Sequence, residues 1–204
     1  MAAMITDPLL VEQLIARRRE IGADRYDEVW EDVYVTSPLA NNEHQELVGQ
    51  LTTVLEISVG WEGLGKVFPG ANITDRRDDW TQNYRCPDVV VFLNDTQAEN
   101  LDTHWYGGPD LAIEIISPHD RARDKQKFYA KVGTRELLLV DRDPWALELY
   151  RLNGGLLAQV GRSTLESSSL ITSEVVPLSW KLIPGEFRPQ IEIVHADGKQ
   201  QWTI

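Results

Sequence analysis

Two apolar stretches of the chain each contain one acidic residue, and this pattern restricts the possible folds more than any other feature. Residues 87–93 contain Asp88, and residues 110–118 contain Glu114 at their centre. Apolar runs of this length are typical of strands that are covered on both faces. An ionised carboxylate in such a strand costs free energy unless it meets a metal ion, a cation or several hydrogen-bond donors. Two of them on successive strands predict a shared partner, and a divalent cation fits because Mg²⁺ prefers oxygen ligands.

Each acid taken alone also has a purely structural explanation. It could lie at the end of a strand and accept hydrogen bonds from the backbone, or it could pair with a nearby arginine. The candidate arginines are Arg85, Arg121 and Arg135. Both explanations stay open when the acids are considered one at a time.

Lys125 favours the shared site. It lies in a predicted helix, residues 121–132, which directly follows the second acidic strand. Tyr129 is four residues further on and therefore on the same face of that helix. An ammonium group that reaches Glu114 could orient an attacking water or stabilise charge that develops on phosphorus. The alternative is an exposed lysine in a segment that contains two more lysines.

The other elements are predicted from periodicity and turn residues. A capped amphipathic helix is expected from Asp7 to about Gly22, and a second helix over residues 42–60. The order of strand 110–118, helix and strand 136–140 predicts a crossover between parallel strands. A short hairpin or strand is predicted over residues 26–36. Further strands are predicted over residues 66–73, 85–93 (with Asp88 inside it), 147–152, 156–160, 175–178 and 191–194, the last four as antiparallel additions or a cap.

Composition excludes several classes of protein. The chain has 32 acidic and 20 basic residues and a net charge of −12, so any contact with nucleic acid must be local. The single cysteine, Cys86, can form neither an internal disulfide nor a thiolate metal cluster, and it has no evident base partner. No segment is typical of a membrane span or a secretory signal, so we expect a cytoplasmic protein with no membrane partner.

Taken together, the motifs resemble the Uma2 family, also called DUF820, a group of restriction-endonuclease-like proteins in the PD-(D/E)XK nuclease superfamily. The similarity spans about residues 26–152 and rests on the order of residues 87–91, residues 109–118, Lys125, Tyr129, Gly133 and residues 136–141. It implies an α/β (α+β) fold, with a restriction-endonuclease-like core in which helices flank a central mixed sheet. We expect one such domain over residues 1–204, with an N-terminal helix (1–24), the core (26–152) and a C-terminal β-rich extension (153–204).

The resemblance also implies roles for individual residues. Asp88 and Glu114 would hold a Mg²⁺ or Mn²⁺ ion, and the backbone carbonyl of Ile115 would add a ligand. The superfamily usually has its catalytic lysine two residues after the second acid, where this chain has Ile116. Uma2-like sequences share this departure and have a lysine on the next helix, which Lys125 matches. The candidate catalytic residues are thus Asp88, Glu114 and Lys125.

Additional site residues are less narrowly defined. In similar nucleases a further acid often comes from the first core helix or the strand before it, and the candidates here are Glu28, Glu43 and Glu46. His44 falls where Uma2-like proteins tend to have a histidine. It could contact substrate or, like Tyr129, support the ligands from behind.

Two arginines beside the expected site, Arg121 and Arg123, are candidate phosphate contacts. They could instead pair with Asp120 and Asp124, their neighbours in sequence. Both explanations are compatible with the sequence.

The function that the resemblance implies is metal-dependent hydrolysis of phosphodiesters, as an endonuclease acting on DNA. A homodimer is expected, because cutting both strands of a duplex usually takes two sites, and a two-fold protein matches a two-fold substrate. The alternative is a nuclease-fold protein that no longer cuts and serves as a dimeric binding or regulatory module. The acidic net charge and Ile116 favour this alternative, whereas the joint presence of the three candidate catalytic residues favours the enzyme.

Overall fold

The computed structural model describes residues 3–37, 40–117 and 121–204, so Pro118, at the end of the second acidic motif, lies outside it. Within these ranges the chain forms an α+β fold around a mixed sheet of six strands in the order β13-β12-β11-β10-β7-β4. β10 and β11 are parallel, and the other neighbouring pairs are antiparallel. The strands of this central sheet are β4 (Gly65–Pro69), β7 (Val89–Leu93), β10 (Leu111–Ile116), β11 (Glu136–Arg142), β12 (Trp145–Asn153) and β13 (Leu156–Thr164).

β7 and β10 are the two predicted apolar strands, and they are neighbours in the sheet. All but the last residue of each is buried, as expected for strands covered on both faces. Valine and isoleucine dominate both strands because branched side chains pack well on a pleated surface. The predicted crossover is confirmed: β10 leads through α3 (Gln126–Val132) into the parallel strand β11. The helix ends at Gly133, whose φ of 85° is easily reached by glycine.

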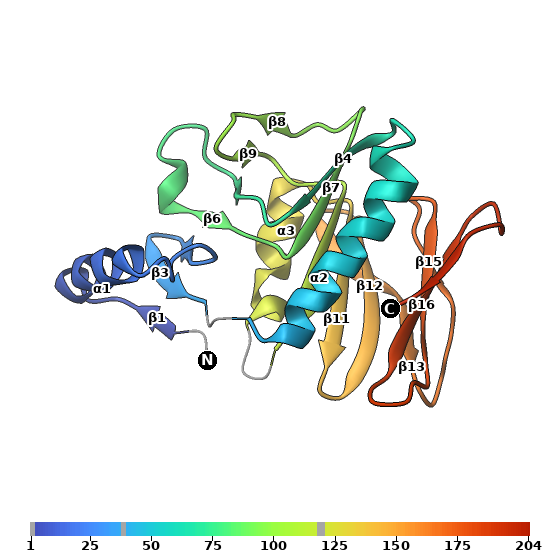
Figure 1. The fold of residues 1–204 in the computed structure, drawn as a ribbon. Coiled ribbons are helices and arrows are strands. Elements are labelled where there is room, and N and C mark those ends of the chain that lie inside the picture. Colours follow the sequence, from blue (N-terminus) through green and yellow to red (C-terminus); the bar gives the residue numbers. More distant parts are fainter. Residues whose placement is uncertain (1–2, 38–39, 118–120) are drawn as a thin grey trace.

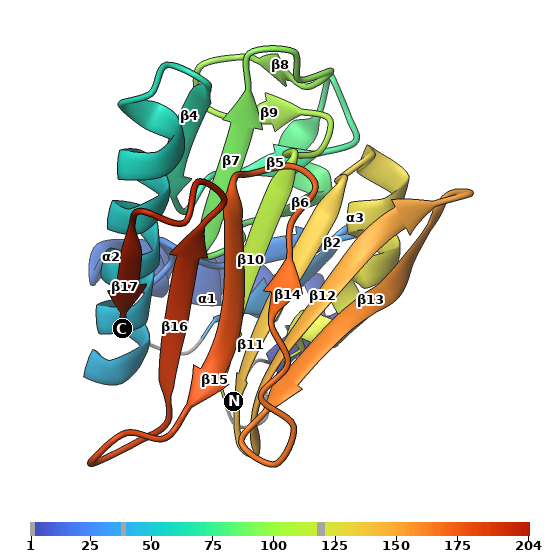
Figure 2. The same cartoon turned by 90° about the vertical axis from the view of Figure 1, so that its right-hand side faces the viewer.

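Helices cover both faces of the central sheet (Figure 2). α2 (Asn42–Leu55) packs on one face and continues into a π-helical turn at Glu56–Gly60. α3 packs on the other face and is preceded by the 3-10 turn Ala122–Lys125. In the described ranges, no helix has both the length and the apolar character needed to cross a membrane.

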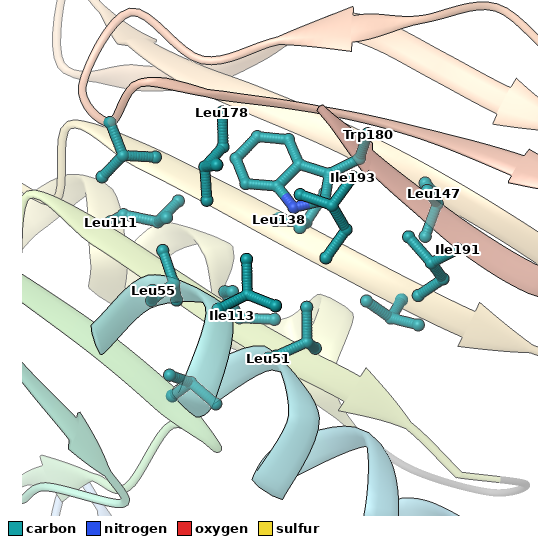
Figure 3. Packing of buried hydrophobic residues seen from close by; sticks show 14 of the residues in the cluster. Leu51, Leu55, Leu111, Ile113, Leu138, Leu147, Leu178, Trp180, Ile191 and Ile193 are labelled. Atoms are coloured by element: carbon teal, nitrogen blue, oxygen red, sulfur yellow. The ribbon is translucent and has the colours of Figure 1, made fainter. Parts of the chain in front are cut away.

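A C-terminal sheet shares the face of the central sheet that α2 covers (Figure 2). Side chains of β10, α2 and this sheet meet in one buried cluster, in which Trp180 inserts among Leu138, Ile193 and Leu178 (Figure 3). The C-terminal residues thus act as the expected cap and antiparallel additions. The strands of the C-terminal sheet are β14 (Ile171–Thr172), β15 (Leu178–Ile183), β16 (Gln190–His195) and β17 (Gln201–Thr203).

A third sheet carries the N-terminal part of the chain, which lies at the opposite end of the molecule from the C-terminal sheet (Figure 1). α1 (Pro8–Glu20) follows its first strand, and the Asp7 side chain caps the helix by accepting from the N–H groups of Leu9 and Leu10. The helix buries the expected apolar face only in part: Leu9 is 73% and Leu10 57% exposed, whereas Val11, Leu14 and Ile15 are half-buried. The strands of this sheet are β1 (Ala3–Ile5), β2 (Glu28–Trp30), β3 (Val33–Thr36), β5 (Ile73–Thr74), β6 (Tyr84–Arg85), β8 (Glu99–Asn100) and β9 (Trp105–Tyr106), with the 3-10 turn Trp80–Gln82 between β5 and β6.

Two predicted strands differ from the structure. The segment 66–73 is divided between β4 and β5, because Gly70 turns the chain with a φ of 74° and sends the two strands into different sheets. The strand expected over 175–178 starts only at Leu178, since Val175 and Val176 donate their N–H groups to the Ser173 hydroxyl and form a bend.

Candidate active site

The two acids of the apolar stretches lie side by side at one edge of the central sheet. β7 and β10 pair Val89 with Ile113, and one further step of this register sets Asp88 opposite Glu114. Asp88 was expected inside the strand, and this prediction is wrong: Asp88 directly precedes β7. Its Oδ2 accepts a hydrogen bond of 2.7 Å from the N–H of Ile115, which explains why a carboxylate is held at this position. Both acids line a cavity of about 310 Å³.

Glu114 projects from the middle of β10 towards the α3 face, where both of its carboxylate oxygens accept hydrogen bonds. Lys125 Nζ lies 2.9 Å from its Oε1 and 3.1 Å from its Oε2, and the Tyr129 hydroxyl donates to the same Oε1. Lys125 ends the 3-10 turn and Tyr129 belongs to the helix that follows, so the predicted common face is confirmed. The lysine thus reaches the acid from the next helical segment, while Ile116 stands two residues after Glu114.

Of the three acids considered as a further member of the site, only Glu28 reaches it. Glu28 Oε1 lies 2.8 Å from Lys125 Nζ and accepts from the backbone N–H of Cys86, also at 2.8 Å. Glu43 instead binds Arg142 at 2.8 Å. The side chain of Glu46 is 56% exposed and faces Arg188 at 3.7 Å, outside the cavity lining.

The site carries an excess of buried negative charge. Burial first of all, and then the charges of Asp88 and Glu28, raise the pKa of Glu114 to about 8, although Lys125 opposes the increase. Burial likewise raises the pKa of Tyr129 well above its usual value, with a further contribution from Glu114. Glu28 and Glu114 thus flank the Lys125 ammonium group, and Asp88 lies opposite Glu114 in the strand register, an arrangement that a divalent cation would balance.

The oxygen atoms of the site fit a hard divalent ion. Mg²⁺ is commonly held by one or two carboxylates together with water and substrate phosphate, and Asp88 and Glu114 supply two carboxylates beside a cavity. Within the described ranges, no group of three or more histidine, cysteine or acidic side chains is arranged to hold a metal alone. Other ligands would have to complete the coordination.

His44 is brought to the site by the first turn of α2. The side chain of Asn41 caps this helix by accepting from the His44 N–H at 2.9 Å. His44 Nε2 lies 3.2 Å from Asp88 Oδ1, on the opposite carboxylate oxygen from the one bound to Ile115. The other ring nitrogen, Nδ1, is buried and has no hydrogen-bond partner among the described residues. The histidine therefore contacts an acid of the site directly, as the sequence suggested.

The two candidate phosphate contacts point in different directions. Arg121 lines the cavity, where its guanidinium lies 5.2 Å from the ring centroid of Trp30 and 2.7 Å from Asp124. Arg123 faces away from the cavity and binds two carboxylates, those of Asp141 at 2.8 Å and Glu148 at 2.5 Å. Arg123 is thus not placed as a phosphate contact, and the alternative partner Asp120 lies outside the described residues.

The arginines proposed as structural partners of the two acids have other contacts. Arg85 stacks between the rings of Trp30 and Phe128, at 4.6 and 4.3 Å. Arg135 binds Asp110 at 3.2 Å. Arg121, the third candidate, binds Asp124, so none of the three explains the acidic pair.

Besides Arg25, sequence reasoning missed one buried basic residue of the cavity, Arg142. It ends β11, next to Asp141, which pairs with Ile116 in the parallel register. Its side chain is 5% exposed and donates to the Ser117 hydroxyl at 2.7 Å. The predicted crossover contains the signal that could have found it, because residues at the same ends of parallel strands meet at one sheet edge.

Cys86 also lines the cavity and is predicted to be unreactive. Burial raises the pKa of its thiol to about 12, and the Glu28 charge adds to the increase. Because the thiolate is the nucleophile, iodoacetamide at about pH 8 should alkylate Cys86 about 50-fold more slowly than free cysteine. Mass spectrometry of the folded chain measures the rate, and the urea-unfolded chain is the control. Equal rates in the two states would contradict this prediction.

The mixed central sheet, with an acidic pair and a lysine at one edge, places the protein in the restriction-endonuclease-like fold class. The model of the Uma2 family, described as a putative restriction endonuclease, matches residues 12–184. The chain therefore belongs to the Uma2 family, which confirms the resemblance seen in the sequence.

Comparison with solved structures supports the same fold. A putative nuclease belonging to DUF820 from Anabaena variabilis ATCC 29413 is similar, with a TM-score of 0.58 and 19% sequence identity. The similarity covers 72% of this chain and 80% of that chain. At this level of identity the likeness shows the fold alone. No curated protein matches the sequence.

Proposed function

We propose that the protein is a Mg²⁺- or Mn²⁺-dependent endonuclease that hydrolyses phosphodiester bonds in DNA. The observation that carries this proposal is the convergence of Asp88, Glu114 and Lys125, from three different elements, on one cavity. Membership of the Uma2 family supports a nuclease-like activity. The fold alone would not support it, because a fold can host many functions.

Asp88, Glu114 and the backbone carbonyl of Ile115 are the proposed metal ligands. When bound, the ion polarises a phosphate oxygen and lowers the pKa of a water molecule. The protein prepares these groups in advance: the N–H of Ile115 fixes one oxygen of Asp88, and His44 lies beside the other. A preorganised ligand set needs little rearrangement when substrate arrives.

Lys125 is proposed to position the attacking water or to stabilise charge on phosphorus. Glu28 and Glu114 hold its Nζ at 2.8 and 2.9 Å, which restricts the ammonium group to the wall of the cavity. Tyr129 supports Glu114 from behind. Arg121 is the proposed phosphate contact, because its guanidinium already lies in the cavity wall.

The DNA substrate and a homodimeric state are parts of the same proposal. Two strands of a duplex require two cuts, and two copies related by a two-fold axis would supply two sites. Local cations such as Arg121 and Arg142 would provide the contact with phosphates, since the chain as a whole is acidic.

The test is a cleavage assay with purified protein. Supercoiled plasmid and labelled oligonucleotides are incubated with Mg²⁺ or Mn²⁺, beside the variants Asp88→Ala, Glu114→Ala and Lys125→Ala. Cleavage by the wild type that requires metal and is lost in the variants supports the proposal. Equal activity in the wild type and all three variants would end it.

A non-cutting binding module is the second candidate, favoured by the complete engagement of both Glu114 oxygens in the structure. Metal binding distinguishes the proposed nuclease from the non-cutting module. On the proposed function, Mn²⁺ at 100 times its dissociation constant should stabilise the wild type by about 2.7 kcal/mol, which corresponds to a rise in Tm of about 5–10 °C for a chain of this size. The rise should vanish in Glu114→Ala, and no response in the wild type would favour the module.

A further inference from the structure

A second cavity adjoins the acidic one and has a different chemical character. Its volume is about 250 Å³, and it shares a wall with the first cavity that is formed by Arg25, Tyr26, Pro69, Gly70 and Cys86. None of the acids at the proposed metal site lines it. The proposed mechanism does not use this space.

The lining of the second cavity combines aromatic rings with side-chain amides. Phe68 and Trp105, whose ring centroids are 6.0 Å apart, form its inner wall, where Trp105 is buried and stacks on Phe92, so that Tyr26 is the exposed ring of the lining. Asn72 Nδ2 donates to the backbone carbonyl of Thr103 at 3.2 Å, and Asn100 Oδ1 accepts from a backbone N–H at 2.8 Å. In each amide, the other polar end can still donate to or accept from a ligand. Rings that stack and amides that pair with polar edges are the groups that proteins use to bind nucleobases.

The wall between the cavities lets a ligand lie against both. Gly70 approaches closely there: a Cβ at this position would lie 3.3 Å from the Tyr26 ring and 3.7 Å from the Cys86 sulfur. Tyr26 is 38% exposed, and the guanidinium of Arg25 lies 5.5 Å from its ring centroid. A flat ring beside a cation is suited to a base on one side and a phosphate on the other.

The depth of the acidic site restricts what can reach it. The side chains of Glu114 and Lys125 are only 5% and 10% exposed. A phosphate enters a cavity of about 310 Å³ together with its own nucleotide, and a paired strand would have to follow if that nucleotide stayed in a duplex. The net charge of −12 also disfavours a long contact with duplex phosphates.

We propose that the second cavity binds one unpaired nucleobase, with Tyr26 as the stacking residue, next to the phosphate held at the acidic site. The inference rests on the proposed function and deepens it: the substrate class is a nucleic-acid strand with at least one unpaired nucleotide. A base that is already unpaired saves the unstacking and unpairing cost of a few kcal/mol that a perfect duplex requires.

The test measures binding separately from cleavage. Fluorescence anisotropy compares a labelled DNA strand, its perfect duplex and the same duplex with one unpaired nucleotide, in Ca²⁺, with gels to confirm that the DNA stays intact. The single strand and the interrupted duplex should bind at least about tenfold more tightly than the perfect duplex. Tyr26→Ala should weaken binding of the single strand about fivefold or more, and Tyr26→Phe should retain it.

Tyr106→Ala is the matched control. Tyr106 is 36% exposed and has Arg77 at 5.2 Å from its ring, but it lines neither cavity. Equal affinities for the three DNAs, no measurable binding, or equal losses in the two alanine variants would overturn the inference. Metal-dependent cleavage of all three DNAs at equal rates would overturn it and leave the proposed function intact. Selective binding of the single strand and the interrupted duplex, with no cleavage in Mn²⁺, would overturn the proposed function and leave the inference about the second cavity intact.

Discussion

Replacing Glu114 by glutamine is expected to lower the rate of phosphodiester cleavage by about 10³-fold while the chain stays folded. Glutamine keeps the size of the side chain and an oxygen that can accept from Tyr129 and Lys125. It removes the negative charge that the proposed metal ion requires. Lys125 retains Glu28 as a counter-ion at 2.8 Å, so the buried ammonium group is not left alone.

Initial rates of oligonucleotide cleavage in Mn²⁺ measure this effect, and the urea midpoint of unfolding checks the fold. Glu46→Gln is the matched control, because Glu46 is a glutamate whose side chain is 56% exposed and lies outside the cavity lining. Its rate should equal that of the wild type. A Glu114→Gln protein that cuts within about threefold of the wild-type rate would remove Glu114 from the proposed mechanism.

Replacing Lys125 by methionine is expected to destabilise the protein by about 3–5 kcal/mol. The substitution leaves Glu28 and Glu114, whose side chains are 3% and 5% exposed, without the cation that lies between them. Breaking a buried ion pair is costly because the charge left behind has lost its water and gains no partner. Urea unfolding followed by circular dichroism gives the change in the free energy of unfolding.

Lys127→Met is the control for this experiment, because Lys127 is exposed and lies two residues further along the chain. It should change the free energy of unfolding by less than about 0.5 kcal/mol. A second control, Lys125→Met combined with Glu28→Gln, should recover part of the loss, since one uncompensated charge is removed. Equal stabilities of the two lysine variants would contradict the buried ion pair.

The loss in Lys125→Met should grow with pH. Burial and the neighbouring carboxylates raise the pKa of Glu114 to about 8 in the folded wild type, from its usual 4.5. Between these values the folded state holds a proton that the unfolded chain has released, so stability falls as pH rises through this range. Without Lys125 the pKa of Glu114 rises further, because the lysine opposes the increase. The variant therefore continues to lose stability above about pH 8, where the Glu114 contribution of the wild type is already lost, and the difference grows there. A difference between variant and wild type that stays constant between about pH 8 and 10 would contradict this.

The parts of the fold that could be predicted are those in which the signal is local. β7, β10 and the crossover to β11 follow from contiguous apolar runs and from a helix between two of them. The two-residue strands β5, β6, β8 and β9 have no such signal, since their pairing depends on segments far away in the sequence. The apolar residues that follow Asp88 predict that it lies inside a strand. The hydrogen bond from the Ile115 N–H, which fixes Asp88 just before the strand, leaves no signal in the sequence.

The residues of the site also fall into two groups, those that local spacing predicts and those that distant segments of the chain bring in. Glu114, Lys125 and Tyr129 lie within one strand and the following helical segment, so short-range spacing brings them together. The choice of Glu28 over Glu46 depends on how the N-terminal sheet lies against the central sheet, which no spacing reveals. The error over Arg123 has a local cause: the segment starts as a tighter 3-10 turn, in which side-chain directions differ from those of an α-helix.

The position of Lys125 between Glu28 and Glu114 has a consequence for how the protein matures. Its two carboxylate partners belong to separate sheets: Glu28 lies in β2 of the N-terminal sheet, and Glu114 lies in β10 of the central sheet, far along the chain from β2. On the proposed function, a molecule whose N-terminal sheet has not packed on the central sheet lacks one of the two carboxylates that hold the lysine, so the ability to cut is acquired only when both sheets are in place.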